Sequence, residues 1–278
     1  MRKGIYTALI LCLILAVIGV GLVIAGISLG GRPNFRLDWK NRAILAGDAP
    51  LQSGEAAPEA CTSLEIDVAT ADIEVRVGDA FRVEYALYDA PQITQTDGVF
   101  RLKEPEHGIN VIGISGFSGQ DAYVRVTVPA GAQLESVKLD SSTGVLTVSE
   151  LACKTLTVDL STGDANLIGV SADVLTADAS TGSIRLTDCA VKDAQFDVST
   201  GSIEARNLTV TESLRADAST GDVALDIRGQ AADFAMELES GTGAVRVDGK
   251  DQGDDYSSSG SIPITVDTST GDVTITFR

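Results

Sequence analysis

The chain has 278 residues, of which 44% are hydrophobic but only 5% aromatic, and its formal net charge is −18. So acidic a chain repels phosphate, which argues against nucleic acids and anionic lipid surfaces as partners. The four cysteines (Cys12, Cys61, Cys153 and Cys189) show no zinc-site spacing, so we expect them to be small apolar packing residues.

The N-terminus begins with Met1-Arg2-Lys3 and continues as an unbroken apolar run to about Gly30. About 26 helical residues, rising about 1.5 Å each, can cross a hydrocarbon core of about 30 Å. We therefore expect residues 1–30 to form a single transmembrane helix. A cleaved signal peptide is the alternative, but its apolar core would be shorter and no clear Ala-x-Ala site follows.

Basic residues stand on both sides of this segment, so a simple count of Lys and Arg does not settle its orientation. The larger group would favour the cytoplasmic side by that rule: Arg32, Arg36, Lys40 and Arg42. However, a short basic tail before a long apolar run resembles an export signal, and the rest of the chain is acidic and rich in strand patterns. We expect a single-pass protein of the cell membrane with its C-terminal part extracytoplasmic.

Two segments lead from the predicted anchor to the repeats. Residues 31–60 are expected to be a juxtamembrane segment and linker, because 43–60 is small, polar and proline-bearing. Residues 61–130 contain several short alternating runs separated by turn residues, which predicts strands without a strict repeat. We interpret residues 61–130 as the irregular start of a β structure that covers its open end.

From residue 131 to 278 the sequence repeats the motif Asp-x-Ser-Thr-Gly, with alternating apolar residues on both sides. The repeated glycines are Gly144, Gly163, Gly182, Gly201 and Gly221, which are 19, 19, 19 and 20 residues apart, and worn copies follow at Gly243 and Gly271. A degenerate first copy stands at residues 67–71. A fixed period near 20 residues predicts stacked coils, and these short strands favour an all-β parallel β-helix or solenoid, right-handed by the crossover rule.

Each coil is expected to bend at its Ser-Thr-Gly. Around Gly163 the apolar parity slips by one residue, which a continuous strand cannot do, and glycine permits the positive φ of a corner. The acids that precede the bends should form one outer column about 5 Å apart. They are Asp140, Asp159, Asp178, Asp197, Asp217 and Asp267, with Glu239 in a worn copy.

Three roles are open to this acidic column. Each Asp could accept hydrogen bonds from backbone N–H groups of its own bend, which would offset the repulsion between like charges. The column could instead bind divalent cations such as calcium. Catalysis by paired carboxylates is disfavoured, because the spacing recurs at every coil. We expect the structural role, with no cofactor and no catalytic or metal-binding residue.

A second outer column follows the glycines and is interpreted as a solvated face. Its members are Asp164, Ser183, Ser202, Asp222 and Asp272.

The period stretches near the end of the chain, where a polar loop is expected at residues 249–263. It contains Asp251, Asp254, Asp255 and Tyr256, for which a solvated loop is expected and a cation contact is the alternative. The last strand ends at Phe277, so either Phe277 and the loop cover the final coil or that coil docks on a partner. His107 is the single histidine and cannot form a proton relay alone.

The combination of Val128-Pro129-Ala130-Gly131, the repeated Asp-x-Ser-Thr-Gly motif and an N-terminal anchor resembles a bacterial family of candidate adhesins of unknown function. The resemblance covers roughly residues 63–277. It implies a fold of β-strand repeats, often found on envelope proteins, and it brings no catalytic residues to this chain.

These observations predict a non-enzymatic, membrane-anchored envelope protein whose solenoid makes structural, adhesive or sensing contacts with an envelope protein or a glycan. One alternative is a carbohydrate-binding or carbohydrate-active β-helix of the envelope. Another is a regulatory partner of a membrane protein, acting through Gly26 and Gly30 or through an open last coil. The oligomeric state stays open.

Overall fold

The computed structural model describes residues 19, 35–38, 43–46, 51–105, 110–112 and 122–278. The chain divides into two compact units, Met1–Pro50 with His107–Gln120 and Leu51–Glu106 with Asp121–Arg278. Apart from residue 19, the predicted anchor lies outside the described residues, as do Cys12 and His107. Among the residues that are described, no helix has the length and apolar character needed to cross a membrane.

The first unit contains one small antiparallel sheet. Its strand order is β2 (Ala43–Ala46), β1 (Phe35–Asp38) and β9 (Asn110–Ile112). Both β1 and β2 fall in the segment 31–60, which the composition had predicted to be a linker.

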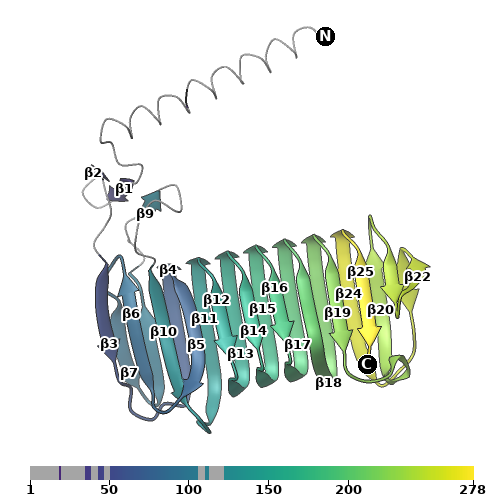
Figure 1. Ribbon diagram of the computed structural model, residues 1–278, viewed down its shortest axis with the longest axis horizontal. Coiled ribbons are helices and arrows are strands. Elements are labelled where there is room, and N and C mark those ends of the chain that lie inside the picture. Colours follow the sequence, from purple (N-terminus) through teal and green to yellow (C-terminus); the bar gives the residue numbers. More distant parts are fainter. Residues whose placement is uncertain (1–18, 20–34, 39–42, 47–50, 106–109, 113–121) are drawn as a thin grey trace. The chain divides into compact units, whose positions relative to one another are not determined.

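The second unit is a β-solenoid, in which successive coils lie side by side along one axis (Figure 1). Its long-strand face is built, in spatial order, from β7 (Gln92–Thr96), β8 (Val99–Lys103), β4 (Ser63–Thr70), β11 (Leu134–Thr143), β13 (Ala152–Thr162), β15 (Ser171–Thr181), β17 (Ala190–Thr200), the second part of β18 (Ile203–Thr220), β24 (Ile262–Thr270), β20 (Phe234–Ser240) and β23 (Asp255–Ser257).

The short-strand face lies beyond the corners of the same coils. Its order is β3 (Gln52–Ala56), β6 (Arg82–Leu87), β10 (Tyr123–Pro129), β5 (Asp72–Gly78), β12 (Leu146–Ser149), β14 (Ala165–Ile168), β16 (Ile184–Thr187), the first part of β18, β19 (Val223–Ile227), β25 (Val273–Phe277), β21 (Val245–Val247) and β22 (Lys250–Gly253). Between the coils the pairing is parallel, as the repeat predicted; antiparallel pairs occur only toward the two ends of the described solenoid. A single 3₁₀ turn, η1 (Ala231–Asp233), is the helical element assigned to this unit.

The corner glycines explain why the motif repeats. Gly221 has φ of 141°, and a Cβ atom placed on it would lie 1.7 Å from the carbonyl oxygen of Gly201. The Gly201 N–H donates to the Thr220 carbonyl at 2.9 Å, so backbone pairing continues through the corner. Only glycine fits, because both the backbone conformation and the closeness of the next coil exclude a side chain.

The core is a set of apolar columns that run through the stack. One column reads Leu139, Val158, Ala177, Phe196, Ala216, Val266 and Leu238 in spatial order, and all seven are buried. The large Phe196 lies in register between Ala177 and Ala216. The small side chains on both sides leave room for the ring of Phe196 in the core.

The described cysteines are free. Cys61 and Cys189 are buried in the core, as predicted for small apolar residues, and Cys153 is half-buried. Burial raises the pKa of Cys153 to about 11, with a smaller contribution from the negative charge of Asp173.

The start of the solenoid is more regular than expected. Strand β4 pairs with β11 so that Asp67 lies beside Asp140 and Thr70 beside Thr143, which confirms the degenerate repeat copy at residues 67–71. Strand β5 continues this first coil beside β12. Only the remaining strands of this region, β3, β6, β7, β8 and β10, form the irregular part that covers the first coil.

At the other end, the order of the coils in space differs from their order in sequence. Strand β24 pairs directly with β18, and β25 with β19, so the C-terminal coil lies inside the stack. The coil of β20 and β21 comes earlier in the sequence but lies outside it. The expectation that the last coil of the sequence is also the terminal coil was therefore wrong.

The outer coil is covered by the chain itself. The segment 249–263, expected to be a loop, contributes β22 and β23, which pair antiparallel with β21 and β20. The Phe277 ring stacks on Phe234 at 5.1 Å between ring centroids. Both predicted elements of a cover, Phe277 and the polar segment, thus contact the outer coil.

Candidate functional site

The acidic residues of the repeat form one continuous column on the outer side of the long-strand face. In spatial order the register reads Asp67, Asp140, Asp159, Asp178, Asp197, Asp217, Asp267 and Glu239. Neighbouring parallel strands are about 4.8 Å apart, so successive residues of the column are spaced at roughly that distance. We call these eight residues the acidic ladder.

The ladder does not make the hydrogen bonds expected of it. Among the described residues, no backbone N–H group donates to the side chains of Asp140, Asp159, Asp178, Asp197 or Asp267. Because these side chains leave the strand before the corner, they project from the flat face. The prediction that they accept bonds at the bend was wrong in its choice of residue.

The corner role belongs instead to the column that follows each glycine. The Ser183 N–H donates to Asp164 Oδ1 at 2.8 Å, and the Asp272 N–H donates to Asp222 Oδ1 at 2.8 Å. The Ala244 N–H donates to Asp272 Oδ1 at 2.9 Å. Each such carboxylate therefore links one coil to the next, and this column is structural as well as solvated.

Two arginines reinforce these corner carboxylates. The Arg185 guanidinium lies 2.7 Å from Asp164, and that of Arg246 lies 2.6 Å from Asp272. The hydrogen bond from each arginine is the main reason why the pKa of its partner carboxyl is lowered. Both carboxylates are thus stabilised in their ionised form by a neighbouring guanidinium group.

The middle of the ladder is not neutralised. Lys103 pairs with Asp67 at 3.0 Å near one end, and Arg215 pairs with Asp217 at 2.6 Å toward the other. The four acids between them, Asp140 to Asp197 in register, form no ion pair with any residue that the structure describes. Burial, and next the charges of neighbouring ladder acids, raise the pKa of Asp140 and of Asp178.

The ladder leads into a shallow hollow at the end of the solenoid, of about 350 Å³. Its lining includes four acids and one aromatic side chain, Glu237, Glu239, Asp255, Asp267 and Tyr256. Within the described part of the chain, no group of three or more His, Cys, Asp or Glu side chains is arranged to hold a metal ion. Asp251, Asp254 and Asp255 lie on or beside β22 and β23 and are exposed.

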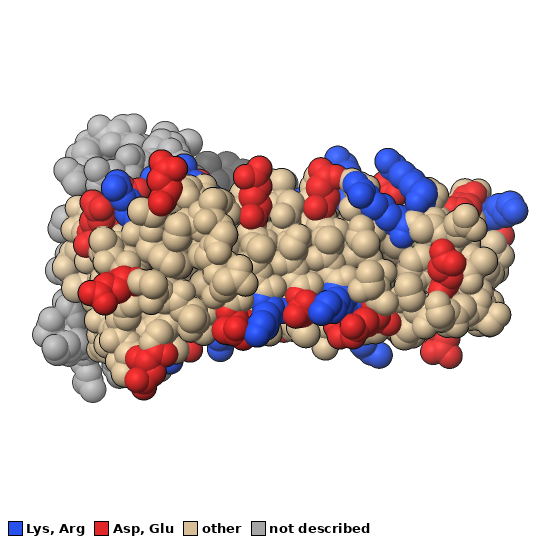
Figure 2. Space-filling model, turned by 90° about the horizontal axis from the view of Figure 1, so that it is seen from below, with Lys and Arg blue, Asp and Glu red and all other residues tan. Residues whose placement is uncertain are grey.

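Another column carries alternating charges. Lys154 pairs with Glu135 at 2.6 Å, and Lys192 pairs with Asp173 at 2.8 Å, each across neighbouring coils. Seen along the strands, charged side chains gather in two rows at the margins, with a largely uncharged band between them (Figure 2). The columns therefore differ in charge. In some columns acidic and basic side chains form ion pairs, whereas the ladder contains only acidic side chains.

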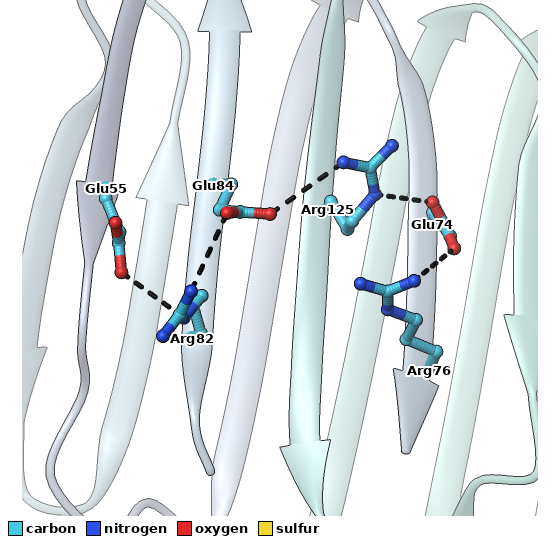
Figure 3. Close-up of polar contacts among 6 residues, drawn as sticks. All are labelled: Glu55, Glu74, Arg76, Arg82, Glu84 and Arg125. Atoms are coloured by element: carbon cyan, nitrogen blue, oxygen red, sulfur yellow. Dashed lines mark hydrogen bonds and ion pairs between the residues drawn. The ribbon is translucent and has the colours of Figure 1, made fainter. Parts of the chain in front are cut away.

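An ion-pair network not predicted from the sequence crosses the first strands of the short-strand face (Figure 3). Arg125 lies 2.7 Å from Glu74 and 3.8 Å from Glu84, while Arg82 lies 3.3 Å from Glu55 and 4.0 Å from Glu84. The alternating charges in these strands were a usable signal, but their pairing depends on β10 lying between β5 and β6.

Comparison with known proteins gave three results. A family model described as Toastrack DUF4097 matches residues 61–213 and 180–276. Curated proteins gave no match. Similar solved structures include a candidate adhesin from Bacteroides fragilis NCTC 9343, with 13% identity and a TM-score of 0.43 over 83% of this chain and 98% of that one.

Two further structures come from Parabacteroides distasonis ATCC 8503. One is described as a candidate adhesin, with 15% identity and a TM-score of 0.40 over 84% of this chain and 98% of that chain. The other is described as a candidate lipid-binding protein, with 15% identity and a TM-score of 0.37 over the same shares of the two chains.

Proposed function

The chain belongs to the Toastrack DUF4097 family, and from this premise we propose that it is a non-enzymatic, membrane-anchored protein of the cell envelope. Its solenoid presents a rigid surface for adhesive, structural or sensing contacts. The acidic ladder is the contact surface.

The observation that carries this proposal is the alignment of carboxylates without neutralising partners over four consecutive coils. The corner column differs, since Asp164 there is paired with Arg185. Like charges about 5 Å apart repel by roughly 0.8 kcal/mol in water. The chain carries this cost along the ladder, and a positively charged surface would relieve it.

A ladder of this kind favours many weak contacts over a single strong one. Each exposed ion pair contributes only about 0.2–1 kcal/mol. Several carboxylates held at a fixed spacing add their contributions once the first has bound, because the later contacts are intramolecular. The natural partner is therefore a repetitive cationic surface, such as a polymer with regularly spaced amines or a basic protein face.

The apolar composition of residues 4–30 supports the membrane anchor. With the C-terminal part extracytoplasmic, the anchor would hold the solenoid at the outer side of the membrane, where it can reach such a partner. A cysteine placed after Arg278 and labelled on intact cells with an impermeant reagent tests this orientation. Protection of that cysteine would contradict it.

The function is tested by adhesion of cells that display the full-length chain. Wild-type cells should bind amine-coated beads more strongly than carboxylate-coated beads. A variant with asparagine at positions 140, 159, 178 and 197 should lose most of this binding. The matched control removes four exposed acids away from the ladder: Asp79, Asp97, Glu150 and Glu212.

Two outcomes decide the matter. Equal loss of binding in the ladder variant and in the control would mean that net charge, not the ladder, is responsible. Turnover of any glycan by the purified chain would instead favour the carbohydrate-active alternative. That alternative draws on the hollow beside Tyr256, where an aromatic ring and carboxylates lie together.

A further inference from the structure

The short-strand face has a hollow of about 380 Å³, where a small residue interrupts a column of larger ones. In this column Asn166, Arg185, Glu204, Ala224 and Thr274 follow one another in register on successive coils. Ala224 has the shortest side chain of the five. Ala224 is one of the residues that line the hollow, so a longer side chain at this position would extend into it.

The walls of this hollow are polar and carry both signs of charge. Its charged lining residues are Glu204, Arg206, Asp222, Asp226 and Arg278, and the hydroxyl-bearing ones include Thr274 and Thr276. A hollow of 300–1,000 Å³ with a few convergent polar groups is the size of small-ligand sites in general.

Several polar groups that line the hollow have no hydrogen-bond partner among the described residues. Arg185 and Arg246, in the same column on other coils, are bound to Asp164 and Asp272. By contrast, neither Glu204 nor Arg206 makes an ion pair or side-chain hydrogen bond with any residue in the described ranges. Asp222 uses one carboxylate oxygen for the Asp272 N–H and keeps the other.

Asp226 supplies the clearest sign of a missing partner. Its side chain is only 13% exposed, one oxygen pairs with Arg278, and the buried Oδ1 has no hydrogen-bond partner in the described structure. An unsatisfied buried carboxylate oxygen is costly to a fold. The Arg278 side chain is 69% exposed, so its displacement would open Asp226 to an entering donor.

We infer that this hollow binds an amine-bearing sugar unit of a glycan. Three carboxylates against two guanidinium groups favour a ligand with positive charge, and its ammonium group would donate to Glu204, Asp222 or Asp226. The ring hydroxyls would accept from Arg206 and bond to Thr274. The inference rests on the proposed function in one respect: it takes the glycan to be a contact partner of the solenoid.

The test measures binding of a β-linked glucosamine tetramer to the full-length chain in detergent micelles by calorimetry. Its fully N-acetylated counterpart, which lacks the ammonium groups, should bind at least about tenfold more weakly, which is about 1.4 kcal/mol. Ala224→Arg fills the hollow with the side chain that Arg185 and Arg246 place in the same column. It should reduce binding of the glucosamine tetramer at least about tenfold.

The matched control is Thr147→Arg, which adds the same side chain to the same column on β12, away from the hollow. It should leave binding unchanged, and the thermal unfolding of both variants should match wild type. All of these measurements are made in a chain that also carries asparagine at positions 140, 159, 178 and 197, because the ladder is itself proposed to bind regularly spaced amines. Binding that remains in this background and depends on Ala224 belongs to the hollow.

Three results would overturn the inference: undiminished binding to Ala224→Arg, equal affinity for the acetylated tetramer, or no saturable binding of either sugar. None of them bears on adhesion to amine-coated beads, which tests the ladder. The ladder can therefore fail the adhesion test while the hollow binds sugar, and the hollow can fail to bind sugar while the ladder supports adhesion.

Discussion

The carbonyl oxygen of Gly163 occupies the space that a side chain at Gly182 would need: a Cβ atom there would lie 1.8 Å from it. The two glycines belong to neighbouring coils, 19 residues apart in the sequence. Their contact shows that the corner is limited by backbone packing between coils, not by the turn of one coil alone.

We therefore expect Gly182→Ala to destabilise the solenoid by at least about 3 kcal/mol, from a backbone conformation almost confined to glycine and from the clash. Gly249→Ala is the control, since Gly249 also has positive φ but has no atom within 4 Å of the added Cβ. It should cost only about 1–2 kcal/mol. Urea unfolding measures both, and equal losses would show that backbone conformation alone matters.

Phe196 and Ala177 provide a test of core packing. Phe196→Ala should cost about 3–5 kcal/mol, because it leaves a cavity between coils. Ala177→Phe alone should overpack the core and destabilise it by about 1–3 kcal/mol or more. The double variant moves the ring by one coil and should recover part of the loss. Strict additivity in a double-mutant cycle would contradict the packing argument.

The two acidic columns should respond to pH with opposite signs. The pKa of Asp178 is raised in the folded state, so the folded protein binds its proton more readily. Its destabilising effect is present at neutral pH and is relieved as the pH falls through the folded pKa. Asp178→Asn should therefore stabilise the protein by about 1 kcal/mol at pH 7, with the difference from wild type vanishing below about pH 3.8.

Asp164 is the counterpart on the corner column. Its pKa is lowered, so it contributes stability above its unfolded pKa that is lost as the pH falls through the folded pKa. Asp164→Asn should destabilise the protein by about 1–2 kcal/mol at pH 7. Denaturant unfolding at pH 7 and at acid pH compares both variants. The same sign for both at pH 7 would refute the distinction between the columns.

Cys153 should react slowly with thiol reagents in the native protein. With a pKa of about 11, its thiolate fraction at pH 8 is roughly two orders of magnitude below that of an unperturbed cysteine. Labelling by iodoacetamide, followed by peptide mass spectrometry, measures the rate at Cys153. Denaturant should restore a normal rate, whereas fast native labelling would contradict the burial.

Much of the fold followed from the repeat. Identical spacing of Gly144, Gly163, Gly182 and Gly201 forces equivalent residues into register, so the parallel stack and its apolar columns were predictable. The order of the last two coils in space was not predictable. The spacing of the motif gives the register within a pair of coils, but it does not say which of the later coils is the neighbour of β18. A weak signal existed: the copy at residues 267–272 preserves the motif better than the copy at 239–243, and it lies inside the stack.

The position of the acidic column was predicted from the sequence, but the hydrogen bonds that its residues make were not. The register that aligns Asp159 with Asp178 follows directly from the repeat. Which acid serves the corner does not, because Asp159 and Asp164 stand on either side of the same glycine and both are plausible acceptors. The choice depends on the direction in which each side chain leaves the backbone.

The insertion of residues 262–277 between two earlier coils has a consequence for biosynthesis. The coil that ends at Ile227 meets its permanent neighbour only after residues 262–277 have been made, with the coil of β20 and β21 made in between. Until then its strand edges stay open, while the coils before it can already stack. The stack beyond Ile227 is thus completed only once residues 262–277 have been made, and a nascent chain that stops before residue 262 would carry exposed strand edges for quality-control factors to recognise.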